Sequence, residues 1–338
     1  MPAVRPIGGL GSVGLLLPTV PRVDFPAHTG TTTGANLGRT WGTTAWLAEV
    51  CQEAEEAGAG ALWATDHLFW GRPMLECLAT LAVAATTTRS LVVGSCVLQL
   101  PLRSAPAVAK QAATLQLLSG GRFVLGVGSG SHPGEYRAAG VPYAGRGRRL
   151  DRAIDELRVA WATAGDLDLG YRQEPAAAPV PVWVGGSSPA ARRRAAAAGD
   201  GWIPLFVPTG ELARSFEHLR RETAEAGRDP AEVTTAAVLA VAVGDDRRAH
   251  LGGTRWLSAL YGIPPKAFDR HLVAGSPARC AEEVALLADA GAEHVVLMVA
   301  DDHPLDHFAG IVEALGPARP ATGRPTDRTR RDLTEVPA

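Results

Sequence analysis

Three places in the sequence share one pattern, in which a predicted helix ends in Ala-Gly and a short apolar strand follows at once. These junctions fall at residues 55–63, 197–203 and 289–297. A glycine just past a helix takes the left-handed conformation that ends it, so the strand can begin within a few residues. Strands that are apolar on both faces suit a parallel sheet covered by helices. The pattern therefore predicts a repeated helix–strand unit.

Eight apolar segments are predicted as strands, with helices between them. The strands are expected at residues 13–17, 61–65, 91–98, 122–126, 180–184, 201–204, 234–243 and 295–299. The clearest helices are expected at residues 44–57, 105–118, 146–162, 189–198 and 277–290. Eight strands that alternate with helices over about 300 residues predict an α/β fold of the (β/α)₈ barrel type. A doubly wound open sheet is the alternative.

Two segments interrupt the predicted repeat. Residues 21–39, rich in Thr and Gly, are expected to form a long loop on the face where barrel active sites lie, and residues 247–272 are expected to add inserted helices. The apolar periodicity stops after Gly316, which predicts a disordered tail over residues 317–338. We accordingly expect a single domain over residues 1–316, with an insertion at about 247–272.

Composition argues against several classes of function. Hydrophobic residues make up 46% of the 338 residues and the formal net charge is -2, which allows a large core and disfavours nucleic acid as a partner. No apolar run reaches the roughly 18 residues that a membrane span needs, and the N-terminus lacks the order of a signal peptide. The four cysteines form no CxxC motif. We therefore expect a cytoplasmic protein with reduced thiols.

Asp66 and His67 end the second predicted strand, which places them at the mouth of a barrel, where catalytic residues gather. Side chains alternate along a strand, so only one of the two faces the lumen unless the backbone turns there. The alternative is an aspartate that caps the next turn beside a hydrogen-bonded histidine. On position alone, the two interpretations are about equally supported.

Two glycine-rich turns also follow predicted strands. Gly126 to His132 alternates glycine and serine, which lets backbone amides approach a ligand, although a plain tight turn fits as well. In the second turn, Ser188 can cap a helix whose first residue is Pro189, so free amides and the helix dipole point at the preceding Gly-Gly-Ser. We interpret the second turn as a phosphate site, with an ordinary capped helix as the alternative.

Non-redox chemistry has less support in the sequence. Residues 301–307 mix Asp and His after the last strand, but no third cluster complements them, so we expect no metal site. A Schiff-base aldolase needs a lysine at a strand end, whereas Lys110 falls within a helix and Lys266 in the insertion. A metal-dependent lyase would depend on the 301–307 cluster. The intact glycine-rich turns argue against a cofactor-free binding protein.

With Asp66-His67 and both glycine-rich turns in place, the sequence resembles the bacterial-luciferase-like oxidoreductases over roughly residues 10–315. These are TIM-barrel enzymes that use a flavin or the deazaflavin coenzyme F420. The resemblance implies that His67 or Asp66 handles protons and that a cis peptide lies at Cys96–Val97, with Ser95–Cys96 as the alternative. It implies the following cofactor-binding residues: Asp66, Ser95, Cys96, Val97, Gly128, Ser129, Gly130, Gly185, Gly186, Ser187 and Ser188. The substrate pocket is expected to include Trp70, Ser131, His132 and Tyr136.

Within this family two chemistries compete. With F420, a hydride moves between the substrate carbon and the deazaflavin, whereas with reduced FMN the flavin reacts with oxygen in a monooxygenase. The Asp66-His67 pair favours F420 and a small organic substrate. Ser131 stands where the sugar-phosphate dehydrogenase branch has a glutamate, so the substrate of that branch is not expected. We also expect a homodimer and, were the cofactor FMN, a separate reductase.

Overall fold

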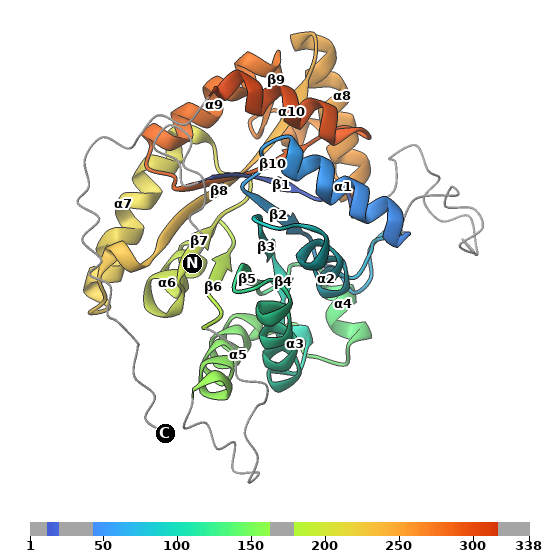
Figure 1. Ribbon diagram of the computed structural model, residues 1–338. Helices are drawn as coiled ribbons and strands as arrows, with labels where there is room; N and C mark the ends of the chain where they lie inside the picture. The colour runs from blue at the N-terminus through green and yellow to red at the C-terminus, as the bar shows by residue number, and fades with distance from the viewer. Residues whose placement is uncertain (1–11, 20–42, 163–178, 317–338) are drawn as a thin grey trace, which may run out of the picture.

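Eight parallel strands close into a barrel in the computed structural model, which describes residues 12–19, 43–162 and 179–316 (Figure 1). Around the ring the strands are β1 (Ser12–Leu16), β2 (Ala61–Ala64), β3 (Val92–Ser95), β5 (Phe123–Gly128), β6 (Val182–Gly185), β7 (Gly201–Ile203), β8 (Thr234–Val243) and β10 (His294–Val299). Strand β10 pairs with both β8 and β1, which closes the ring. The predicted barrel is confirmed, and the open-sheet alternative is excluded.

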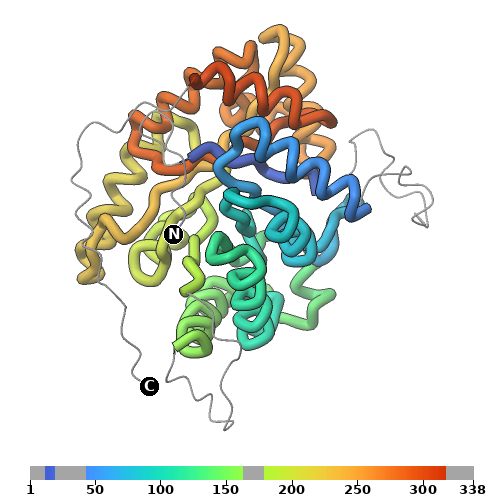
Figure 2. Tube along the Cα trace, viewed as in Figure 1, coloured from blue at the N-terminus to red at the C-terminus, as the bar shows by residue number. Residues whose placement is uncertain are grey.

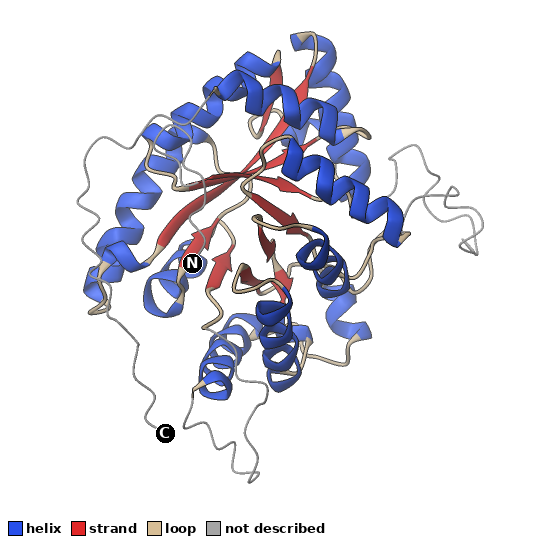
Figure 3. Cartoon of the chain, in the orientation of Figure 1, coloured by secondary structure: helices blue, strands red, loops and turns tan. Residues whose placement is uncertain are grey.

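Helices cover the outside of the ring (Figure 3). They are α1 (Thr44–Glu56), α2 (Cys77–Thr87), α3 (Ala105–Leu118), α5 (Arg146–Trp161), α6 (Pro189–Ala198), α7 (Thr209–Glu225), α9 (Pro277–Asp289) and α10 (Pro304–Leu315). The five predicted helices agree with the structure to within one residue at their C-terminal ends. Thr43, Ser188 and Ser276 cap α1, α6 and α9 by accepting a hydrogen bond from a backbone amide. The first and last helices, α1 and α10, lie side by side (Figure 2).

Two short strands lie outside the ring of eight. Strand β4 (Leu98–Gln99) pairs with β5, and a cis peptide at Cys96–Val97 separates it from β3, so the predicted strand at 91–98 is two strands with a break. Strand β9 (Leu272–Gly275) pairs with the C-terminal end of β8. It follows α8 (Asp246–Tyr261) and the 3₁₀ turn η4 (Pro265–Phe268). The expected insertion is therefore helical except at its end, where it adds this strand.

The core has an outer and an inner part. In the outer part, aliphatic side chains of the strands pack against the helices. In the inner part, the N-terminal half of the barrel interior holds Trp63 and Trp183, whose rings are stacked with centroids 5.1 Å apart. A Cβ at Gly94 or Gly201 would lie 2.4 Å or 2.6 Å from these indole rings. Glycine on the neighbouring strands therefore makes room for the tryptophans, which line a cavity of about 540 Å³ at the N-terminal end of the barrel.

Several smaller expectations concern the chain outside the barrel. No helix within the described ranges is long and apolar enough to cross a membrane. All four cysteines are free thiols, as expected. The predictions for residues 21–39 and 317–338 lie outside the described residues. The remaining short elements are α4 (Pro133–Ala138), η2 (Leu100–Leu102) and η3 (Pro230–Glu232).

Candidate active site

The C-terminal ends of neighbouring strands surround a cavity of about 320 Å³, here called the inner cavity. This is the barrel face at which enzymes of this fold place their chemistry. Nine residues predicted for cofactor or substrate border it: Asp66, Cys96, Val97, Gly128, Ser129, Gly130, Ser131, Gly185 and Gly186. Ser95 is fully buried behind the wall, with its hydroxyl donating to the carbonyl of Gly126. Ser187 and Ser188 are exposed on the turn beyond Gly186.

The cis peptide at Cys96–Val97, which the family resemblance implied, is present. It turns the Val97 side chain into the space above two glycines. A Cβ at Gly128 would lie 2.6 Å from Val97 Cγ2, and one at Gly185 would lie 2.7 Å from Val97 Cγ1. Only glycine leaves room for this arrangement, because real Cβ contacts are almost never that short. The glycines thus hold a valine-centred floor in the inner cavity.

Asp66 faces away from solvent and is fully engaged. Its Oδ1 accepts from Arg103 Nη2 at 2.6 Å, and its Oδ2 accepts from Arg103 Nη1 at 2.8 Å and from the Gln99 amide at 2.9 Å. A bidentate arginine pair of this kind holds a carboxylate in one orientation. Asp66 therefore anchors the end of β2 to the segment that follows β4.

His67 points the other way, toward the cavity, because the chain turns as it leaves β2. Its Nδ1 lies 2.9 Å from Oε2 of Glu135, and its ring stacks on the indole of Trp70 with centroids 3.9 Å apart. The ring is held by a hydrogen bond at one nitrogen and by an aromatic face. Such double restraint fixes the direction in which Nε2 can act.

Glu135 was not predicted, and it is a main finding of the structure. Its carboxylate is fully buried and accepts from the amides of Leu68 and Phe69, at 2.7 Å and 3.2 Å, as well as from Gln99 Nε2. Burial alone would raise the pKa of Glu135, but the hydrogen bonds and the charge interaction with His67 lower it below its ordinary value. In the sequence, Glu135 appears only as an acid in the first turn of a short helix. No local signal in the sequence connects it to residue 67.

Gln99 completes the contact between the strand ends. Its Nε2 donates to the carbonyl of Asp66 and to Glu135, so its Oε1 points toward Gly130. Within the described residues, this buried Oε1 has no hydrogen-bond partner. An unpaired buried acceptor costs roughly 1–3 kcal/mol. Because Gln99 borders the inner cavity, a ligand bound there can supply the missing donor.

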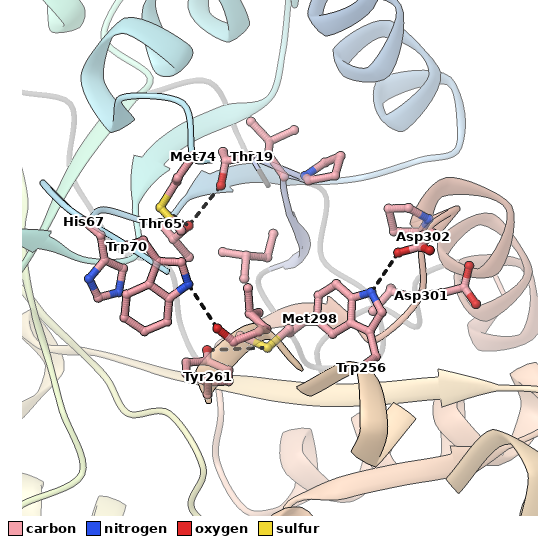
Figure 4. Close-up of a pocket in the computed structure, with 16 residues that line it drawn as sticks. Thr19, Thr65, His67, Trp70, Met74, Trp256, Tyr261, Met298, Asp301 and Asp302 are labelled. Carbon is pink, nitrogen blue, oxygen red and sulfur yellow. Dashed lines mark hydrogen bonds between the residues drawn. The ribbon is translucent and has the colours of Figure 1, made fainter. Parts of the chain in front are cut away.

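A second, narrower cavity of about 80 Å³ adjoins the first and is here called the outer cavity (Figure 4). Its walls are mostly apolar and aromatic, with Trp70, Met74, Trp256, Tyr261 and Met298 among them. Five residues border both cavities: Leu16, Thr65, His67, Tyr261 and Met298. His67 therefore lies where the two spaces meet.

The predicted insertion builds one side of the outer cavity. Helix α8 supplies Trp256, Leu260 and Tyr261. Trp70 Nε1 donates to the carbonyl of Leu260 at 3.0 Å and Trp256 Nε1 donates to Asp302 at 3.1 Å, as Figure 4 shows. These α8 residues were not predicted, because the insertion interrupts the barrel repeat and nothing in the repeat places it over the mouth of the barrel.

The four predicted substrate residues have different positions. Trp70 borders the outer cavity and Ser131 the inner one. His132 is exposed and meets Trp70 edge to face. Tyr136 borders neither cavity: it is fully buried beneath the glycine-rich loop, with its hydroxyl bonded to the carbonyl of Ser129. Tyr136 thus supports the loop from below, which corrects the expectation that it lines the pocket.

The N-termini of helices α5 and α6 border the glycine turns. Helix α6 begins at Pro189 after the cap Ser188, and the preceding Gly186 has φ +109°. Helix α5 begins with Arg146-Gly-Arg148-Arg149 and has no acidic residue in its first turn. Arg146 Nε donates to the carbonyl of Gly130 at 3.2 Å, so the Arg146 side chain lies against the glycine-rich loop that borders the inner cavity. The helix dipole makes the N-terminal end of α5 positive, and its arginine side chains add to that charge. This edge of the inner cavity therefore favours anions.

The acidic and histidine residues that follow β10 lie at the edge of the outer cavity. Asp301 Oδ1 accepts from the amide of His303 at 2.7 Å, and its Oδ2 lies 3.5 Å from His307 Nε2. Within the ranges that the structure describes, no group of three His, Cys, Asp or Glu side chains is placed to hold a metal ion.

Comparison with known proteins gives consistent matches. A family model described as luciferase-like monooxygenase matches residues 23–252. An uncharacterised protein of Mycobacterium tuberculosis is 40% identical over 169 residues, which is 47% of this chain and 57% of that one. A phthiodiolone/phenolphthiodiolone dimycocerosates ketoreductase from the same species is 31% identical over 194 residues, 53% of this chain and 51% of the other. The chain thus spans about half the length of the curated relatives it matches.

Among solved structures, an F420-dependent secondary alcohol dehydrogenase in complex with an F420–acetone adduct superimposes with a TM-score of 0.69 at 17% identity. The match covers 90% of this chain and 98% of that one. At this identity the likeness shows the shared fold.

Proposed function

Because the chain belongs to the luciferase-like monooxygenase family, we propose that it is an oxidoreductase that uses coenzyme F420 to move a hydride to or from a small organic substrate. The observation that carries this proposal is the position of His67 at the junction of the two cavities. The inner cavity would hold the cofactor and the outer one the substrate. A proton-handling group would then lie beside the atoms that react.

The residues of the inner cavity fit a tricyclic cofactor. The valine-centred floor offers a flat apolar support, and Gly128 and Gly185 keep the neighbouring walls free of side chains. Gln99 Oε1, which has no hydrogen-bond partner among the described residues, offers an acceptor to an N–H or O–H group of the ligand. The Gly186 turn with the capped N-terminus of α6 would bind the phosphate.

The deazaflavin would supply a ring carbon that gives or takes a hydride. The chain would supply the rest: the apolar wall of the outer cavity holds the substrate carbon against the ring and excludes water. His67 Nε2 takes the proton from a substrate hydroxyl, or returns it to a carbonyl oxygen in the reverse direction. We assign this proton to His67 and not to Asp66, because Arg103 and Gln99 already occupy the Asp66 carboxylate.

The charge at the rim favours F420 over FMN. FMN carries a single phosphate, whereas F420 carries a phosphodiester extended by glutamate carboxylates. The arginines at the start of α5 lie beside the inner cavity loop and add positive charge beyond the phosphate turn at Gly186. Several cationic groups along one edge suit a ligand with several negative charges.

The alternative is a monooxygenase that uses reduced FMN and oxygen. It is favoured by one observation, which is that the Gly186 turn and the α6 N-terminus already suffice for the single phosphate of FMN. The description of the matching family points in the same direction.

Fluorescence titration of the purified chain with F420 and with FMN tests the choice of cofactor. We expect saturable binding of F420 and weak binding of FMN, and Arg146→Gln should lower the affinity for F420. Arg152→Gln is the matched control, since Arg152 lies on the same helix but is exposed and paired with Glu156. Tight binding of FMN alone would replace the F420 proposal with the monooxygenase alternative.

A further inference from the structure

Between them, His67 and Glu135 connect two loops that lie 68 residues apart in the chain. One loop follows β2 and the other contains α4. The side chain of His67 is about one-fifth exposed, whereas that of Glu135 is fully buried. Within the described residues, the Glu135 carboxylate forms its ion pair with His67. The other groups that bond to this carboxylate are neutral donors. A buried anion surrounded in this way requires a proton on the nitrogen that faces it.

The donors around Glu135 fix which ring nitrogen that is. Oε1 accepts from the Leu68 and Phe69 amides, which leaves Oε2 for Nδ1 of His67. Gln99 Nε2 also lies 3.2 Å from Nδ1, but its hydrogens point at the carbonyl of Asp66 and at the carboxylate. Turning the Gln99 amide over would bring its oxygen against the Glu135 anion. Every donor at this point is therefore consistent with a hydrogen on Nδ1.

We propose that Glu135 is a positioning residue that fixes His67 with Nδ1 protonated, so that Nε2 keeps its lone pair for a substrate proton. A carboxylate behind an imidazole does this by accepting from one nitrogen and by stabilising the positive charge that forms when the other takes a proton. No atom of Glu135 needs to touch the substrate. This inference deepens the proposed function. Its consequence for turnover rests on that function, whereas the protonation pattern of the His67 ring does not depend on any cofactor.

The direct test is NMR on the chain labelled with ¹⁵N-histidine, without cofactor, over a range of pH. His67 is assigned as the signal that disappears in His67→Gln. In the neutral ring we expect Nδ1 to appear as a protonated, pyrrole-type nitrogen and Nε2 as an unprotonated one. The reverse pattern in the wild-type chain would overturn the proposal, and this test needs no substitution at Glu135.

Glu135→Gln gives the sharper result. The Gln oxygen should stay with the Leu68 and Phe69 amides, which turns the NH₂ group toward Nδ1 of His67. The hydrogen should then move to Nε2, which removes the proton acceptor from the cavity. We expect the NMR pattern to invert and kcat to fall by roughly 10²–10⁴-fold. Cofactor affinity should not change, and Glu135→Asp should restore part of kcat and the original pattern.

Glu222→Gln is the matched control. Glu222 accepts from Arg192 at 2.9 Å, and that hydrogen bond lowers its pKa, but it borders neither cavity. In the Glu222→Gln variant, the NMR pattern of His67 and the value of kcat should match those of the wild-type chain. If Glu135→Gln keeps both the wild-type pattern and wild-type turnover, Glu135 is structural only. Failure of F420 to bind would count against the proposed function and not against the state of the ring.

Discussion

Arg103 holds both carboxylate oxygens of Asp66, with its two terminal nitrogens 2.6 Å and 2.8 Å from them. The Asp66 side chain is 1% exposed and that of Arg103 is 14% exposed. The pair joins the C-terminal end of β2 to the segment that follows β4. It therefore fixes the position of the backbone from which the chain turns to direct His67 toward the cavity.

Replacing Arg103 with methionine should leave the Asp66 anion buried without its partner. Loss of one member of a buried ion pair costs about 3 kcal/mol or more, so the free energy of unfolding should fall by that amount in urea titrations. Arg152→Met is the control, because its exposed pair with Glu156 is expected to contribute about 0–1 kcal/mol. Equal stability of the two variants would show that the Asp66–Arg103 pair does not anchor the site.

Replacing His67 with alanine should slow turnover by roughly 10²–10⁴-fold, because a positioned acid or base contributes about that factor. Binding of the cofactor, followed by fluorescence, should change little, since the phosphate turn and the valine-centred floor stay in place. His218→Ala, on the outer helix α7, should leave both quantities unchanged. A His67→Ala variant with full activity would exclude the histidine from proton transfer.

Gly186 has φ +109°, a conformation that side chains rarely adopt, and an added Cβ would lie 3.2 Å from Ala191 Cβ. Gly186→Val should move the turn out of this conformation, and ligand binding would have to restore it. Since such strain costs about 1–3 kcal/mol, cofactor affinity should fall by roughly tenfold or more. Gly227→Ala tests a second positive-φ site, remote from the cavities; it should lower stability without changing affinity.

His294 gives the stability of the fold a dependence on pH. Burial is the main cause that lowers its pKa from the ordinary 6.5 to about 3. The ring bonds to Ser12 and accepts from Trp63 Nε1 at 2.9 Å, which requires a neutral imidazole. As the pH falls below 6.5, the unfolded chain takes up a proton that the native chain does not, so native stability decreases by up to about 1.4 kcal/mol per pH unit.

The substitution His294→Gln should flatten this slope, because it removes the titrating ring and keeps an acceptor for Trp63. Free energies of unfolding measured between pH 5 and pH 6.5 provide the check. The same slope in the wild-type and variant chains would contradict a neutral, buried His294.

Local sequence patterns determined the barrel. Helix caps such as Ser188 and glycines such as Gly58 mark several helix ends, and the apolar strands repeat between them. Because strands of a parallel barrel all end at one face, knowing the strand ends was enough to bring Asp66 and His67 together with the turns at Gly128 and Gly186. Nine of the predicted residues border the inner cavity for this reason, whereas Gln99 and Tyr261, which also border it, were not predicted.

Only the tertiary structure decided how those residues divide the chemistry. Asp66 and His67 are neighbours in sequence, yet one is bound by Arg103 and the other by Glu135, since the chain turns between them. Both partners lie more than 30 residues away, and neither carries a local signal of its contact. The same holds for Trp256, which an inserted helix brings over the cavity mouth. Sequence periodicity reports which face of an element is buried, whereas pairs of side chains from distant loops are set by how those loops pack.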